Sequence, residues 1–433
     1  MRIAIFVSII VLSLGSFQAV WSEQASIYAP LDGGSKAPVV KVAREHEQQF
    51  VRRGIRFNDP ELQQIVNRVA ETILPVVADT FINFRVYLIR DPSPAAFSLA
   101  DGQIYVHTGL LARLENEAQL AAVLAHEAHH VAAHHHIEAD KLRRTKGNIV
   151  GGVATLLNRN AREGVSYESD GRYFAQSVYS DDMDFEADAG SIALISRAGY
   201  APVAAVQALQ RLRQDPELSL DRGTASFNTL ELMAERQGRL QELVDGMPQQ
   251  YANVAPADAR PLQLRRVIEM TIDDYIRLDR PGTALKFADS LIEARPDAFL
   301  YEAKGESHFA LGPRPVELEQ EFASWVIAGK RAEKTREEIH AKYLALEGGP
   351  ERLAYNLESA VTAFNLAIEL DENSARAYRG LGNLHYEQND FRQAGRNYVK
   401  YLKLATDSMD RPFVLERLQH IKIELTKQKE AGQ

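Results

Sequence analysis

The stretch AAVLAHEAHHVAAHHHIEAD, residues 121–140, holds six of the twelve histidines of this 433-residue chain. All six fall within the eleven positions 126–136. The surrounding residues 115–144 contain no proline or glycine, so they are predicted to form one long helix. A histidine tract on a helix can be a loose metal-binding segment, a solvated face or a catalytic zinc site. The spacing of its residues separates these interpretations.

His126, Glu127 and His130 form an H-E-x-x-H motif. Residues four apart lie one above the other on a helix, so both imidazoles would point at the same place. Zinc bound there would polarise a peptide carbonyl and make a water molecule acidic, and Glu127 would lie beside it as the base. The motif therefore predicts a zinc metalloendopeptidase with His126 and His130 as ligands and Glu127 as the catalytic residue.

The other histidines of the tract are expected to have lesser roles. His129 lies off the face shared by His126 and His130, and His136 repeats its position seven residues later. His134 and His135 lie a turn or more further on, too far to share one ion in an undistorted helix. They are predicted to be surface groups or groups that support a ligand, and His135 is the best candidate for such support.

A catalytic zinc site needs a third protein ligand, which must come from elsewhere in the chain. A second helix is predicted at about residues 175–198, ending near Gly199. It offers five carboxylates: Asp181, Asp182, Asp184, Glu186 and Asp188. Asp184 and Asp188 share one face, whereas Glu186 lies about 200° round the helix from Asp184.

The stretches ADGQIYVHTGLLARLENEAQLAAVLAHEAHH and VYSDDMDFEADAG resemble the M48 family of zinc metallopeptidases. The second motif of that family usually reads S-R-x-x-E-x-E-A-D. The resemblance implies Asp184 as the third metal ligand, Asp188 as its support and Glu186 as the alternative ligand. Aspartate thus stands where the family has glutamate, and its shorter side chain requires a closer approach to the metal.

Further departures from the family lie around this site. Asp181 replaces an arginine, and two segments of the upstream hairpin differ from Asn-Ala-Phe and Pro-Gly-Gly. The later Thr-His-Pro segment is Thr229, Leu230 and Glu231 here, so a latching histidine is absent. Two interpretations follow. The chain is an active enzyme with an altered site, or it is a weakly active or inactive member that serves as a chaperone or scaffold. The intact H-E-x-x-H motif favours activity.

Upstream of the histidines the sequence predicts a helix at residues 59–74, capped by Asp59, and a strand at residues 84–89. Residues 95–111 read as a hairpin that turns at Asp101 and Gly102. Its strands are candidates to hold an extended peptide substrate. Downstream, the glycine-rich residues 147–157 and the polar residues 158–173 suggest a mobile flap.

The C-terminal part of the chain has a repeating pattern. Ala360, Phe364 and Ala367 recur 34 residues later as Ala394, Tyr398 and Tyr401, which is the spacing of tetratricopeptide repeats. Another unit is visible at residues 284–308, and a helix at about residues 412–427 would cap the array. Such repeats present a concave surface to a partner protein. The predicted fold is mainly α with a small β-sheet, a zincin-like metallopeptidase domain followed by an α-solenoid.

The N-terminal residues have the pattern of a secretory signal peptide, with Arg2 before an apolar run and a predicted cleavage after Ser22. An uncleaved membrane anchor is the alternative interpretation. The predicted domains are the signal peptide at 1–22, the peptidase at 23–250 and the repeats at 255–433. The chain has no cysteine, so a core without disulfides must stabilise it.

The composition and the resemblance together predict location and partners. A net charge of −9 without a basic block argues against nucleic acid as a partner. With its signal peptide and repeats, the chain resembles periplasmic M48 enzymes of Gram-negative bacteria. The resemblance implies polypeptide substrates, among them outer-membrane barrel proteins, and the barrel assembly machinery as a partner of the repeats. Peripheral association with a membrane is compatible with this location.

Overall fold

The computed structural model describes most of the chain between residues 56 and 431. The described ranges are 56–77, 82–139, 179–215, 226–248, 264–316 and 341–431, with isolated positions 44, 45, 48 and 52. The predicted signal peptide, the predicted flap and the predicted domain boundary between residues 250 and 255 lie outside them. Two compact units divide the chain: residues 1–214 with 227–265, and residues 215–226 with 266–433. Each unit is described separately.

The first unit begins with a helix and a small sheet. Helix α3 spans Pro60–Ile73, and the Asp59 side chain caps it by accepting a hydrogen bond from the Leu62 amide. The 3₁₀ helix η1 follows at Leu74–Val77. These elements confirm the helix predicted at residues 59–74.

The sheet has three strands in the order β1-β3-β2. Strand β1 (Arg85–Ile89) runs parallel to β3 (Gln103–His107), and β2 (Ala96–Ser98) pairs antiparallel with β3. Gly102 turns the chain between β2 and β3 at a φ of 92°, a conformation that favours glycine. The predicted strand and hairpin are therefore confirmed, and β2 lies at an edge of the sheet.

The histidine helix is shorter than predicted. After the short helix α4 (Thr108–Leu111), α5 spans only Glu117–Ala132, and the chain turns at Ala133 and His134 before a helical turn at residues 135–139. His134 has a φ of 61°, the left-handed conformation that commonly ends helices. The prediction of one uninterrupted helix over residues 115–144 was therefore wrong, because a left-handed residue can end a helix without glycine or proline.

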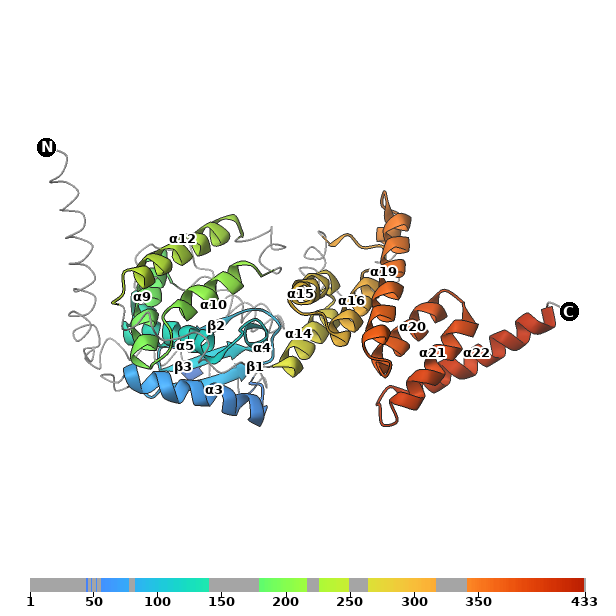
Figure 1. Cartoon of the computed structure of the whole chain (residues 1–433), viewed down its shortest axis with the longest axis horizontal. Helices are drawn as coiled ribbons and strands as arrows, with labels where there is room; N and C mark the ends of the chain where they lie inside the picture. Colours follow the sequence, from blue (N-terminus) through green and yellow to red (C-terminus); the bar gives the residue numbers. More distant parts are fainter. Residues whose placement is uncertain are drawn as a thin grey trace. The chain divides into compact units, whose positions relative to one another are not determined.

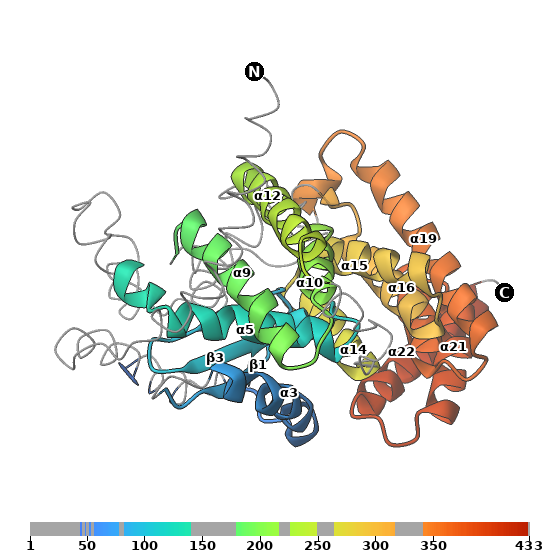
Figure 2. The same cartoon turned by 60° about the vertical axis from the view of Figure 1, so that its left-hand side comes forward.

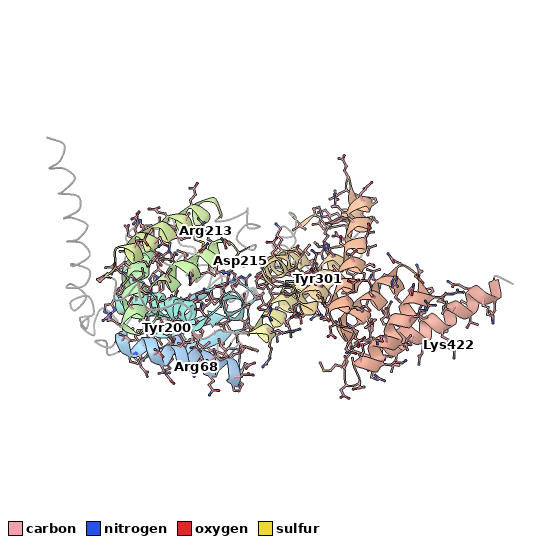
Figure 3. The ribbon with its side chains drawn as sticks, viewed as in Figure 1. Arg68, Tyr200, Arg213, Asp215, Tyr301 and Lys422 are labelled. Carbon is pink, nitrogen blue, oxygen red and sulfur yellow. The ribbon has the colours of Figure 1, made fainter. Side chains whose placement is uncertain are left out.

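Further helices cover α5 on the side away from the sheet. Helix α9 spans Asp181–Arg197 and is capped by the hydroxyl of the preceding Ser180. Helices α10 (Val203–Arg213) and α12 (Ser226–Asp245) follow. Figure 2 shows α9 crossing α5, with the sheet and α3 on the other side of α5. Arg68 of α3, labelled in Figure 3, forms an ion pair of 2.5 Å with the buried Glu117. This pair ties the first turn of α5 to α3.

The second unit consists of helices, as Figure 1 shows. They are α14 (Arg265–Arg277), α15 (Pro281–Ala294), α16 (Ala298–Leu311), α19 (Gly349–Leu370), α20 (Ala375–Glu387), α21 (Phe391–Leu404) and α22 (Arg411–Ala431). Phe364 of α19 is fully buried, and a Cβ on Gly305 or Gly380 would lie within 2.6 Å of its ring. Glycine lets α16 and α20 approach α19, as tetratricopeptide packing requires. The predicted fold class is thus confirmed.

In the described part of the chain, we find no helix whose length and apolar character would let it cross a membrane.

Candidate metal centre

Three side chains from two helices converge on one point in the first unit. His126 and His130 of α5 place their Nε2 atoms 3.0 Å apart. The Asp184 Oδ1 atom of α9 lies 3.4 Å from His130 Nε2. One ligand atom from each residue lies within 4.8 Å of the others, and no second group among the described residues meets this criterion. Two imidazole nitrogens and one carboxylate oxygen form a donor set that suits zinc.

Asp188 and Arg236 hold this group in place. Asp188 Oδ1 lies 3.0 Å from His126 Nδ1, and the Arg236 guanidinium donates two hydrogen bonds of 2.7 and 2.8 Å to the same carboxylate. Arg236 also lies 3.7 Å from Asp184. The resemblance implied that Asp188 supports Asp184, but Asp188 contacts His126 instead. Asp188 lies one turn after Asp184 on α9, and it contacts His126, which lies one turn before His130 on α5.

The pKa values of these groups follow from burial and from their partners. Burial raises the pKa of Asp188, but hydrogen bonds from Arg236 and His126 outweigh it and lower the pKa to about 2. Burial lowers the pKa of His126, yet Asp188 raises it above its ordinary value overall. Burial and the neighbouring histidines keep the pKa of His130 well below its ordinary value. Burial raises the pKa of Asp184 despite the nearby Arg236.

Glu127 lies next to the convergence point and belongs to the same helix. Its side chain is buried, and its Oε2 atom accepts a hydrogen bond of 2.9 Å from the Ser98 hydroxyl of β2. Burial raises the pKa of the Glu127 carboxyl, while His126 and Ser98 oppose the shift. A carboxyl with a raised pKa is suited to both accept and return a proton near neutral pH.

Tyr179 closes one side of the site. Its ring stacks on the His130 imidazole, with centroids 3.8 Å apart and an angle of 11° between the planes. Its hydroxyl lies 2.9 Å from His136 Nε2, and that nitrogen lies 3.4 Å from the Ser98 hydroxyl. Tyr179, His136 and Ser98 thus form a polar group beside Glu127.

Glu186 does not join the three converging side chains. Its Oε1 atom lies 3.6 Å from His129 Nε2 and its Oε2 atom 3.4 Å from His135 Nε2. His129 and His135 are both buried, so His129 is no surface group. The break at His134 turns His135 back toward α5, where its Nδ1 atom lies 2.9 Å from His130 Nδ1.

Sequence reasoning missed three residues of this site: Arg236, Ser98 and Tyr179. Arg236 is 48 residues from Asp188, and no sequence spacing could place it there. Tyr179 lies inside the second segment that carries the resemblance and Ser98 lies two residues before the first, but nothing in a single sequence singles them out. Thr229, Leu230 and Glu231, which replace the family's Thr-His-Pro, lie in α12 with Arg236.

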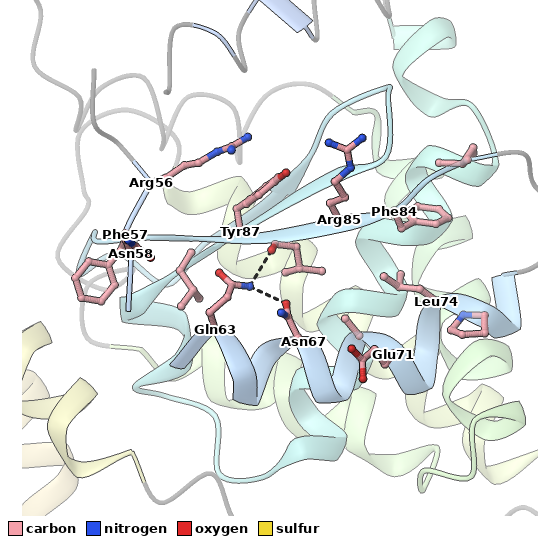
Figure 4. A pocket seen from close by; sticks show the side chains of 15 residues that line it. Arg56, Phe57, Asn58, Gln63, Asn67, Glu71, Leu74, Phe84, Arg85 and Tyr87 are labelled. Carbon is pink, nitrogen blue, oxygen red and sulfur yellow. Dashed lines mark hydrogen bonds between the residues drawn. The ribbon is translucent and has the colours of Figure 1, made fainter. Parts of the chain in front are cut away.

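A pocket of about 740 Å³ lies between α3 and β1, apart from the metal-binding group (Figure 4). Gln63 donates a hydrogen bond of 2.9 Å to the Val86 carbonyl of β1 and one of 2.8 Å to Asn67 of the same helix. The described residues that line it include no histidine and one acidic residue, Glu71. Its lining therefore offers no second set of zinc ligands.

Two histidines four apart on one helix, a carboxylate from a second helix and a buried glutamate beside them form the arrangement typical of metallopeptidase centres. Residues 57–270 match the model of peptidase family M48, and residues 356–389 match a tetratricopeptide repeat. The chain therefore contains an M48 peptidase domain followed by tetratricopeptide repeats.

Curated relatives match parts of the chain. The beta-barrel assembly-enhancing protease of Escherichia coli strain K12 is 25% identical over 226 residues, which are 51% of this chain and 43% of that protein. The protein of the same name from Yersinia pestis is 28% identical over 36% of this chain and 33% of its own length. The mitochondrial metalloendopeptidase OMA1 of Schizosaccharomyces pombe is 33% identical over 34% and 43%. Each match thus spans less than half of the relative.

Proposed function

We propose that the chain is a zinc metalloendopeptidase in which His126, His130 and Asp184 bind the metal and Glu127 is the catalytic base. The observation that carries the proposal is the convergence of two Nε2 atoms, 3.0 Å apart, with a carboxylate oxygen 3.4 Å from one of them. Bound zinc would polarise the scissile carbonyl and make a water molecule acidic near neutral pH.

The residues around the metal-binding group would carry the proton transfers. Glu127 accepts a proton from the attacking water while the water oxygen bonds to the carbonyl carbon. Glu127 then returns this proton to the amide nitrogen as the carbon–nitrogen bond breaks. The hydrogen bond from Ser98 orients the Glu127 carboxylate. The Tyr179 hydroxyl, next to His136 and Ser98, is placed to donate a hydrogen bond to the substrate.

The edge strand β2 offers a place for the substrate backbone. Its inner edge pairs with β3, and in the described part of the sheet its outer edge has no strand beside it. Ser98 at the end of β2 contacts Glu127, so an extended peptide added to this edge would pass close to the site. Such binding recognises main-chain groups and suits unfolded polypeptides.

The wider role rests on the relatives and on the sequence. We propose that residues 1–22 are a signal peptide, that 23–250 form the peptidase domain and that 255–433 form the repeats. The bacterial relatives, named for enhancing beta-barrel assembly, support a periplasmic role on outer-membrane proteins, with the repeats binding the assembly machinery. A mitochondrial relative also matches the chain, so this location depends on the signal-like N-terminus.

A second candidate function is a repeat scaffold whose metal site is only structural. The shorter aspartate at position 184, where the family has glutamate, favours it. In this role the chain would bind client proteins and zinc without cleaving peptide bonds.

Zinc content and casein cleavage by the purified chain separate the two functions. We expect one zinc per chain and cleavage that Glu127→Gln abolishes while zinc remains. Glu138→Gln, an exposed glutamate beyond the helix break, is the matched control and should cleave normally. Zinc without cleavage would select the scaffold. A protein that binds no zinc would overturn both.

A further inference from the structure

The two predicted ligand histidines have their second nitrogens held in different ways. His126 Nδ1 lies 3.0 Å from the Asp188 carboxylate. His130 Nδ1 lies 2.9 Å from another imidazole nitrogen, Nδ1 of His135. An imidazole is a weaker and more ambiguous partner than a carboxylate, because each of its nitrogens can either donate or accept. A further group must therefore decide where the proton between His130 and His135 resides.

Glu186 contacts the other nitrogen of His135. Its Oε2 atom lies 3.4 Å from His135 Nε2, and its Oε1 atom lies 3.6 Å from His129 Nε2. An ionised glutamate side chain only accepts hydrogen bonds, so the His135 nitrogen that faces it is placed as a donor.

We propose that Glu186 is a positioning residue that acts through His135 to present the unprotonated Nε2 of His130 to the metal. The proposal rests on the function proposed above. Glu186 accepts the Nε2 proton of neutral His135, which leaves His135 Nδ1 as an acceptor. His130 then donates from Nδ1, and its Nε2 lone pair faces His126. In the opposite arrangement His130 would carry its proton on Nε2 and could not bind the metal there.

We call the series of contacts from Glu186 through His135 to His130 the relay. Because these histidines are buried, the relay determines which nitrogen of His130 carries the proton. The side chains of His130 and His135 are 1% and 2% exposed, so bulk water cannot replace either partner. Glu186 is 49% exposed and anchors the relay at the surface. The break at His134 makes the relay possible, because an unbroken helix would carry His135 away from His130. Both ligand histidines would then have a carboxylate partner. His126 contacts Asp188 directly, and His130 reaches Glu186 through His135.

Zinc affinity, measured on the full chain by competition with a chelator, tests the relay. We expect Glu186→Gln to weaken zinc binding about tenfold with one zinc still bound at saturation. His135→Phe keeps the ring volume but breaks the relay, so it should weaken binding to a similar extent. The double variant should be no weaker than His135→Phe alone, because both changes break the same chain of hydrogen bonds. Asp182→Asn removes an exposed charge from the same helix and should bind zinc like the wild type.

Several outcomes would overturn the relay while the proposed enzyme stands. One is zinc binding by Glu186→Gln as tight as that of the wild type, and another is an effect of Glu186→Gln that adds fully to that of His135→Phe. Loss of all zinc from Glu186→Gln would instead make Glu186 a ligand. Since Glu186 is half exposed, its variant should fold even where His135→Phe does not, and circular dichroism checks both. A wild type that binds no zinc would overturn the proposed function, and the relay with it.

Discussion

Partly buried arginines lie at the centre of charged clusters in both units, but the two clusters are balanced differently. In the repeat unit, Arg376 pairs with Asp273 and Glu306, and Arg379 lies 3.0 Å from Glu306 and 2.7 Å from Asp410. Burial raises the pKa of Glu306, but the two arginines outweigh it and lower the pKa below its ordinary value. Every charge in this cluster has an opposite charge beside it.

The cluster of the peptidase unit is not balanced in this way. A single guanidinium, Arg236, serves both Asp184 and Asp188, and burial raises the pKa of Asp184 and of Glu127. Their charged forms therefore cost free energy in this site. Groups held at such a cost are common where a ligand or a reaction uses them. The balanced cluster stabilises a fold, whereas the unbalanced one is suited to bind a cation.

The largest effect is expected from Asp184→Ala, which removes one of the three proposed ligands. The variant should lose bound zinc and with it all cleavage, while Glu186→Ala should still bind one zinc at saturation. Without zinc the unfolding temperature of Asp184→Ala should not fall, because a costly, partly buried carboxylate is gone. Metal analysis and thermal unfolding with and without zinc measure this. Stoichiometric zinc in the Asp184→Ala protein would contradict the ligand assignment.

In the repeat unit, Glu306→Gln should act on stability instead. It leaves Arg376 and Arg379 without their shared partner, and the free energy of unfolding should fall by about 3 kcal/mol. Hydrogen exchange in peptides of α16 and α20 would locate the loss, and casein cleavage should be unchanged. Glu372→Gln, at an exposed turn, is the control. Unchanged exchange would mean that the cluster contributes little to the fold.

Tyr179→Phe tests the polar side of the metal centre. The ring remains stacked on His130, so zinc should stay bound. We expect kcat to fall about tenfold with little change in KM, the effect of one lost hydrogen bond of about 1.4 kcal/mol. Kinetics on a fluorogenic peptide measure both constants, with Tyr355→Phe as an exposed control. If Tyr179→Phe loses bound zinc in proportion to its loss of kcat, the Tyr179 hydroxyl has only a structural role.

The smallest effect is expected from acid. Burial raises the pKa of Asp410, but Ser408, Tyr401 and Arg379 lower it to about 2 from an ordinary 3.8. A carboxyl with a depressed pKa stabilises the fold above its unfolded value and loses this contribution as the pH falls. Thermal unfolding should therefore separate the wild type from Asp410→Asn at pH 5, and the difference should be lost below a pH of about 2. A difference that persists there would refute the assignment.

Local patterns allowed the sequence to predict the first elements and the core of the repeats. Asp59 before Pro60 predicted the start of α3, and the 34-residue step predicted the buried positions around Phe364. These features depend on residues close in the chain or on a fixed repeat. The end of α5 could not be predicted, because a histidine in the left-handed conformation leaves no distinctive sequence pattern.

For the metal centre, the sequence by itself determined that His126 and His130 share a helix face with Glu127 next to them, since helical geometry fixes neighbours four residues apart. Only the tertiary structure decided which carboxylate meets them. The crossing of α9 over α5 brings Asp184 to His130 and Asp188 to His126, and the break at His134 directs Glu186 to His135. These contacts depend on how two helices pack and where one of them ends, and neither is encoded in the spacing of a single segment.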